Sequence, residues 1–105
     1  VMQAEEERRS AVESGLLDQY IAVIRQRVER NWVKPATAGP DIDCEVRVTQ
    51  LPSRDIVNVR LGACNADETV RRSIEAAVMK SSPLPAPPDP SLFERNLRFT
   101  FRPEQ

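Results

Sequence analysis

The chain has 105 residues, a formal net charge of −1 and a pI near 5.5, which suits one small domain with a short appendage. The slightly acidic balance argues against a nucleic-acid-binding protein, since such proteins carry a clear basic excess. There is no histidine and there are only two cysteines, which excludes a His-based triad, a His-ligated metal and a complete tetrahedral zinc site within this chain. Carboxylate acid–base catalysis is left open, although no carboxylate pair stands out.

Residues 1–15 predict a charged, solvent-exposed helical lead-in. A run of three glutamates precedes Arg8 and Arg9, and opposite charges at three- and four-residue spacing stabilise a solvated helix. Few apolar residues are available to pack this segment against a core.

Residues 16–32 predict the first main helix. Gly15 predicts a kink or a restart before it, and Pro35 ends it because the residue before a proline is disfavoured in the α region. The apolar side chains recur every three or four residues and form one stripe: Leu17, Tyr20, Ile21, Ile24, Val28 and Trp32.

A β-hairpin follows. Apolar and polar residues alternate over 44–49 and again over 57–61, the signature of half-buried strands. Pro52 suits the second position of the connecting turn. Counting outward from that turn places Val46 near Leu61 and Val48 near Val59 on one face.

The two cysteines fall at the open end of this hairpin. Counting places Cys44 beside residues 63 and 64. Either a bulge at Gly62 brings Cys64 onto the same face as Cys44, or Cys64 lies just beyond the strand. The pair therefore predicts a disulfide closing a loop of about twenty residues; two buried free thiols are the alternative. A disulfide implies an oxidising compartment.

The second helix is predicted to begin with a capping box and to reach Lys80. Asn65 is the expected N-cap, and Glu68 the residue that reaches back to it. The apolar stripe of this helix is Val70, Ile74, Ala77 and Val78.

A proline-spaced segment, SPLPAPPDPSLF, occupies residues 82–93. It is either a PxxP ligand for an aromatic groove or a stiff return loop whose Leu84 fills the core; we favour the return loop. Asp89 followed by Pro90 predicts the start of a short helical turn.

The last strand is predicted over residues 97–102. Its inward residues are Leu97, Phe99 and Phe101, and its outward residues are Arg98, Thr100 and Arg102. Three strands cannot cover themselves, so the predicted fold is α+β: a three-stranded antiparallel sheet with both main helices on one face, in the order α-β-β-α-β. A right-handed crossover gives the strand order 2-1-3, with the last strand at an edge.

The predicted hairpin and the segments 26–32, 62–78, 82–93 and 97–103 together resemble the C-terminal domain of the TolA family, over about residues 16–103. The stretch from Gly62 to Pro103 carries the resemblance most specifically. Some TolA domains have their second cysteine inside the helix, whereas Cys64 precedes it here. The TonB C-terminal domain is the nearest competitor, and the cysteine pair and the LPAPPDPSLF loop favour TolA.

The resemblance implies that residues 1–15 end a helical periplasmic stalk and that residues 16–105 form an interaction domain. TolA is anchored in the inner membrane and driven by TolQ and TolR, and its C-terminal domain binds TolB and Pal to maintain the envelope during division. Group A colicins and the minor coat protein of filamentous phage use the same domain as a receptor. No enzymatic activity, no cofactor and no small-molecule substrate are implied. A TonB-type transducer that binds outer-membrane receptors is the alternative.

The predicted sheet suggests how partners bind. If Val46, Val48, Val57, Val59, Leu61, Phe99 and Phe101 face the helices, four arginines and one carboxylate share the other face. We expect the edge strand Leu97–Arg102 to accept an extended partner segment by β-augmentation, with Arg98 and Arg102 steering acidic residues. The alternative is that the arginines only keep an open sheet soluble. The candidate partner-binding residues are Leu97, Arg98, Phe99, Thr100, Phe101, Arg102, Arg47 and Arg60.

Overall fold

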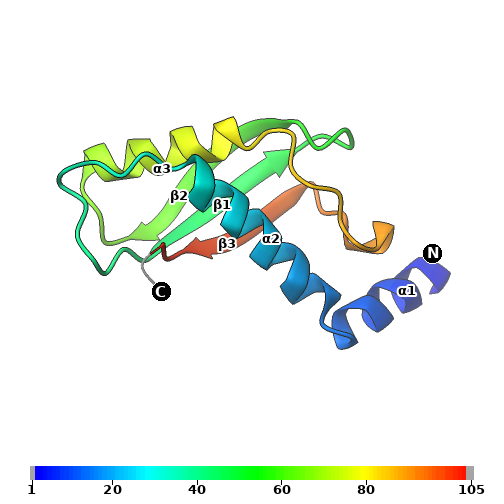
Figure 1. Cartoon of the computed structure of the whole chain (residues 1–105). Helices are drawn as coiled ribbons and strands as arrows, with labels where there is room; N and C mark the ends of the chain where they lie inside the picture. The colour runs from blue at the N-terminus through cyan, green and yellow to red at the C-terminus, as the bar shows by residue number, and fades with distance from the viewer. Residues whose placement is uncertain (1, 104–105) are drawn as a thin grey trace.

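The computed structural model describes residues 2–103, with side chains from residue 5 onward. Val1 and residues 104–105, which the predicted stalk and domain include, lie outside the described residues. The elements in chain order are α1 (Met2–Glu13), α2 (Leu16–Asn31), β1 (Cys44–Gln50), β2 (Ile56–Cys64), α3 (Glu68–Lys80), the 3₁₀ turn η1 (Pro90–Leu92) and β3 (Asn96–Phe101) (Figure 1). The predicted α+β class is confirmed. No helix in this part of the chain is both long and apolar enough to cross a membrane.

The three strands form one antiparallel sheet in the order β2-β1-β3, as predicted. Val46 lies opposite Leu61 and Val48 opposite Val59, so counting from the turn gave the correct hairpin register. β1 is the central strand, and β3 lies at one edge of the sheet.

The prediction that Val57 faces the helices is wrong. Thr49 pairs with Asn58 while Gln50 pairs with Ile56, so Val57 is an extra residue in β2. A bulge of one residue reverses the alternation of faces. Ile56 is consequently buried at 6% exposure, and Val57 is 52% exposed.

The hairpin turn depends on a residue in the left-handed region. The Arg54 N–H donates to the Leu51 carbonyl over 2.7 Å, with Pro52 in the second position of the turn as predicted. Arg54 has a φ of 71°, which is typical of a three-residue hairpin loop. Two hydrogen bonds of 2.9 Å hold it to Leu84: Leu84 N–H donates to the Arg54 carbonyl, and Arg54 Nε donates to the Leu84 carbonyl.

Both main helices cover the same face of the sheet (Figure 1), with α2 contacting β3 and α3 contacting β2. Trp32 joins them at the end of α2, where its ring meets Phe101 edge to face at 5.2 Å and its Nε1–H donates to Ser73 Oγ over 2.8 Å. Leu84 fills the core as predicted. The buried residues of the helices are Tyr20, Ile24 and Val28 on α2 and Val70, Ile74, Ala77 and Val78 on α3.

The predicted capping box at Asn65 is wrong. Asp67 is the N-cap of α3, and its carboxylate accepts from the Val70 N–H over 2.9 Å. Asn65 is instead held by the preceding loop: its side chain accepts from the Asp43 N–H over 3.0 Å and donates to the Asp41 carbonyl over 2.6 Å. Long-range partners therefore displaced the local cap.

The lead-in is helical, as predicted, but it is not free of the domain. Gly15 adopts a left-handed conformation with φ 83°, and α1 turns back toward η1 (Figure 1). Arg8 donates to the Ser91 carbonyl over 2.9 Å and pairs with the Glu94 carboxylate at 2.6 Å. Ala11 is buried, although most of α1 faces solvent. Arg8 and Ser91 are 83 positions apart in sequence, and the left-handed conformation of Gly15 permits the reversal that brings them together.

Candidate functional site

The free edge of β3 is regular. All six residues from Asn96 to Phe101 pair in sequence with Thr49 to Cys44, without a shift of register. Within the described residues, no strand pairs with the other side of β3. Such an edge presents unpaired N–H and C=O groups to a second chain.

The β2 edge differs, because its pairing with β1 is interrupted twice. Register shifts fall between Cys44 and Val46 and between Thr49 and Gln50. Bulges bend and twist a strand, which makes it a poor template for another strand. Of the two edges, β3 is therefore the one suited to accept an extended segment.

The backbone groups on the free edge can be assigned from the hydrogen-bonding pattern. Gln50 N–H donates to the Arg95 carbonyl over 2.8 Å, and hydrogen-bonded pairs alternate along an antiparallel ladder. The backbone N–H and C=O groups of Leu97, Phe99 and Phe101 therefore point toward β1. Those of Asn96, Arg98 and Thr100 point toward the free edge. An added strand would bond to the latter three residues.

The side chains of β3 divide in the predicted way. Leu97, Phe99 and Phe101 are buried against the helices, so none of these three is accessible to a partner through its side chain. Arg98 is exposed and Thr100 is half-buried on the open face. Arg102 lies just beyond β3, and its guanidinium pairs with the Asp43 carboxylate at 3.2 Å.

A groove between α2 and the end of β3 borders the same edge. It has a volume of about 250 Å³ and contains Arg102 on the strand side. A strand added to β3 would place alternate side chains against this wall of α2. The α2 residues of this groove were not predicted, because they lie beside the apolar stripe rather than on it. They are Ala22, Arg25, Gln26 and Glu29.

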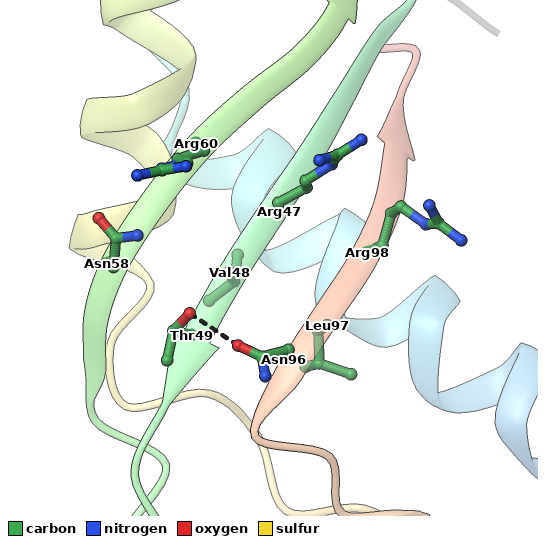
Figure 2. Close-up of a pocket in the computed structure, with 8 residues that line it drawn as sticks. All are labelled: Arg47, Val48, Thr49, Asn58, Arg60, Asn96, Leu97 and Arg98. Atoms are coloured by element: carbon green, nitrogen blue, oxygen red, sulfur yellow. Dashed lines mark hydrogen bonds between the residues drawn. The ribbon is translucent and has the colours of Figure 1, made fainter.

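The open face of the sheet carries a transverse row of arginines. Arg47 on β1 lies directly opposite Arg60 on β2 and directly opposite Arg98 on β3. Arg47 Nε donates to Glu45 Oε1 over 2.6 Å. The three arginines border a shallow depression of about 530 Å³ (Figure 2).

A second, uncharged row lies beside the arginines. Thr49 is opposite both Asn58 and Asn96, and its hydroxyl donates to Asn96 Oδ1 over 2.9 Å (Figure 2). The prediction that Arg47, Arg60 and Arg98 share the open face therefore agrees with the structure. Their direct opposition depends on the strand order as well as on the alternation.

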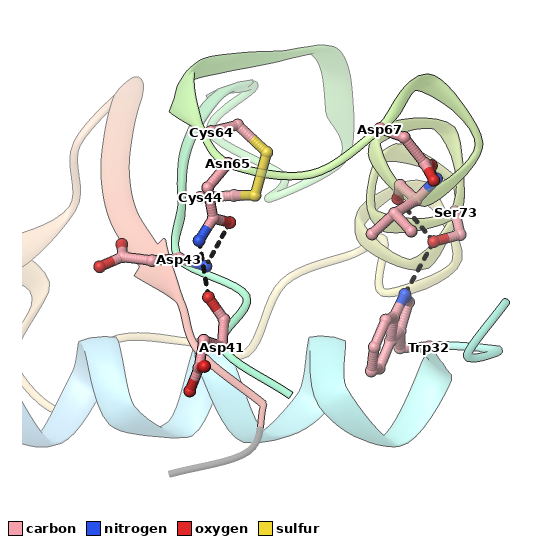
Figure 3. Close-up of a disulfide and its surroundings, with 9 residues drawn as sticks. Trp32, Asp41, Asp43, Cys44, Cys64, Asn65, Asp67 and Ser73 are labelled. Atoms are coloured by element: carbon pink, nitrogen blue, oxygen red, sulfur yellow. Dashed lines mark hydrogen bonds between the residues drawn. A yellow bond between two sulfur atoms is a disulfide. The ribbon is translucent and has the colours of Figure 1, made fainter. Parts of the chain in front are cut away.

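The cysteines form a disulfide at the opposite end of the hairpin from the turn (Figure 3). Their Cα atoms are 4.0 Å apart, and the register shift next to Cys44 is the bulge predicted near Gly62. Asn65 ties the adjoining loop to the same end of the sheet. Among the described residues there is no group of three His, Cys, Asp or Glu side chains placed to hold a metal.

Comparison with known proteins identifies the family. No curated protein matches the chain. Residues 17–101 match the model of a family described as TonB C terminal, and this span includes the sheet, both main helices and the β3 edge. TonB C-terminal domains are periplasmic, non-enzymatic interaction domains of envelope energy transducers, and they bind outer-membrane proteins. The chain belongs to the TonB C-terminal family.

Proposed function

We propose that this chain is a TolA-type interaction domain of the Tol–Pal system. In this role, an inner-membrane anchor would hold the protein in the membrane, the TolQ–TolR complex would couple it to the proton-motive force, and the domain would bind TolB and Pal across the periplasm. Within the TonB C-terminal family, the LPAPPDPSLF loop and the cysteine pair at positions 44 and 64 support the TolA type. Residues 1–15 would then be the end of the stalk that transmits force to the domain.

The mechanism we propose is β-augmentation at the β3 edge. The observation that carries it is the uninterrupted, one-sided pairing of β3. An extended partner segment would form hydrogen bonds with the outward backbone groups of Asn96, Arg98 and Thr100, and these bonds would supply most of the affinity. The guanidinium groups of Arg98 and Arg102 would attract acidic partner residues and speed association.

The same edge is the proposed receptor for group A colicins and for the filamentous phage minor coat protein. Backbone pairing tolerates many side-chain sequences, because main-chain groups provide the affinity. A foreign segment with an extended conformation could therefore use the edge without copying the sequence of the natural partner.

A TonB-type transducer is the second candidate. The match of residues 17–101 to the TonB C-terminal model favours it. In that case the ligand of the β3 edge would be the TonB-box peptide of an outer-membrane receptor. The two candidates share the docking edge and differ in the partner.

The test is a titration of the ¹⁵N-labelled domain with the extended N-terminal segment of TolB, followed by NMR of the backbone amides. We expect the largest shifts at Asn96, Arg98 and Thr100. Thr100→Pro should abolish binding, because proline removes an outward N–H without removing a bond to β1. Thr100→Ala keeps the N–H and serves as the matched control.

Three outcomes would decide between the candidates. Binding that Thr100→Pro abolishes and Thr100→Ala preserves supports both the TolA type and the edge mechanism. Binding with shifts elsewhere would refute the edge mechanism. No binding of the TolB segment at millimolar concentration, together with binding of a TonB-box peptide, would refute the TolA type.

A further inference from the structure

The transverse row of arginines, Arg60, Arg47 and Arg98, is not explained by docking at the β3 edge. A segment added to β3 runs parallel to the strands, so its side chains reach Arg98 but not the arginines on β1 and β2. Within the described residues, Glu45 is the only carboxylate paired with the row, and it contacts Arg47. Arg60 and Arg98 have no acidic partner there.

The row is also unfavourable for the stability of the sheet. Like charges directly opposite each other on neighbouring strands destabilise the pairing, and here a central arginine faces one on each side. In Figure 2 the Arg60 side chain leans away from the other two, as mutual repulsion favours. Alternating charges would keep the face equally soluble, so solubility alone does not account for three arginines in line.

The spacing of the row indicates the shape of its ligand. Opposed Cα atoms lie about 4.5 Å apart in non-hydrogen-bonded pairs and about 5.5 Å apart in hydrogen-bonded pairs. The row contains one pair of each kind, so it spans about 10 Å across the strands. Seven residues of an α-helix advance about 10.5 Å, whereas acidic residues on one face of an extended segment are about 7 Å apart and fit the row poorly.

The chemistry of the depression also limits the ligand. Guanidinium groups bind carboxylates through bidentate hydrogen bonds. The neighbouring Asn58, Thr49 and Asn96 offer amide and hydroxyl groups to polar side chains. None of the eight residues that line the depression is aromatic. Stacking platforms of the kind that hold nucleotide bases are therefore not part of this surface.

We propose that the open face binds the acidic side of an α-helix of a partner protein, laid across the strands. Carboxylates at helix positions i, i+3 or i+4, and i+7 contact Arg60, Arg47 and Arg98 in turn. This surface shares only Arg98 with the β3 edge, and Arg47 and Arg60 lie on the other two strands, so one domain can hold a strand at its edge and a helix on its open face. The inference does not depend on which extended segment the edge accepts.

The test uses two synthetic alanine-rich peptides of 20 residues with equal numbers of glutamates. One peptide, called the aligned peptide, carries the glutamates at positions i, i+3 and i+7. The other peptide distributes them around the helix. Each is titrated into the ¹⁵N-labelled domain at low salt, where charge interactions are least screened. We expect the first peptide to bind with a Kd on the order of 1 mM and to shift the amides of β1 and β2, and we expect 0.15 M salt to weaken it several-fold.

The variant is Arg47→Gln with Arg60→Gln, which leaves Arg98 and the β3 edge unchanged. It should weaken binding of the aligned peptide about tenfold. Its melting temperature should equal or exceed that of the wild type, because the repulsion within the row is relieved. The matched control is Arg30→Gln with Arg72→Gln, which removes two exposed arginines from α2 and α3 and should leave binding unchanged.

Equal binding of the two peptides would overturn the proposal, since only total charge would then matter. An equal loss of affinity for the aligned peptide in the Arg47→Gln, Arg60→Gln variant and in the control would also overturn it. The proposal is supported if the Arg47→Gln, Arg60→Gln variant loses binding of the aligned peptide and still binds the TolB segment or the TonB-box peptide as the wild type does. Helix binding on the open face would then be shown independently of the β3 edge. If neither the TolB segment nor the TonB-box peptide bound, β-augmentation at the β3 edge would be refuted, and the result for the acidic helix would still stand.

Discussion

Replacing Cys44 and Cys64 with alanine should lower the free energy of unfolding by about 3 kcal/mol. The bond joins residues separated by 20 positions in sequence. The chain-entropy relation for a loop of that length gives about 3 kcal/mol at 25 °C, from the loss of conformations in the unfolded state. For a domain of this size, that difference corresponds to a fall in Tm of roughly 10–20 °C.

The disulfide also stabilises the hairpin at the end opposite its turn. The turn closes the hairpin at Leu51–Asp55, and the disulfide closes it at the opposite end. Because β1 is central and pairs with β3 as well, the bond also holds the strand that supports the docking edge. If residues 1–15 are the end of a stalk, as proposed, force applied through them would meet a hairpin that is fixed at both ends.

The measurement is thermal unfolding by circular dichroism, with and without reductant. Reduction should lower the Tm of the wild type and leave that of the Cys44→Ala, Cys64→Ala variant unchanged, which controls for other effects of the reductant. A fall of less than about 2 °C in the double variant would refute the entropic reasoning, since it corresponds to well under 1 kcal/mol.

Three further predictions follow from single contacts. Arg98→Ser with Arg102→Ser should weaken binding of the TolB segment about fivefold at low salt and flatten its salt dependence; unchanged affinity would remove the steering role. Asp67→Ala should cost about 1 kcal/mol in urea unfolding through loss of the α3 N-cap, and a cost near zero would contradict the capping assignment. Burial raises the pKa of the Tyr20 phenol above 10.0, outweighing the lowering effects of Gln50 and Arg54. The folded state therefore keeps the proton longer than the unfolded state, and the related stability is complete below pH 10 and lost as the pH rises through the folded pKa. Tyr20→Phe should remove this part of the alkaline decline, measured by denaturant unfolding at pH 9 and 11; an identical decline in both proteins would exclude Tyr20 as its source.

The elements and the sheet order could be predicted because they depend on local signals. The apolar stripe of α2, the alternation of the three strands and the stop at Pro35 each act over a few residues. The predicted pairs Val46–Leu61 and Val48–Val59 are the observed ones, although the bulge at Val57 shifts the register between the turn and these pairs. The cysteine pair was then close enough to predict the disulfide.

The candidate site was only partly predictable. Arg98 and Thr100 were placed on the correct face, but the α2 wall of the groove could not be found, because its residues lie outside the apolar stripe and nothing in the sequence places them beside β3. The sequence indicated a bulge near Gly62, but it could not reveal the second bulge at Val57 or the uninterrupted pairing of β3. These features depend on how whole strands pair: each bulge leaves one residue of β2 without a partner in β1.

The sequence by itself determined the helices, the strands and the residues that alternate toward the core, since these follow from periodicity and turn chemistry within short windows. Only the tertiary structure decided the exposure of Val57, the cap at Asp67, the return of α1 onto η1 and the alignment of Arg60, Arg47 and Arg98. Each of these depends on groups distant in sequence that meet only when the chain is folded. Competition among such contacts, rather than local preference, selects which partner a side chain finally takes.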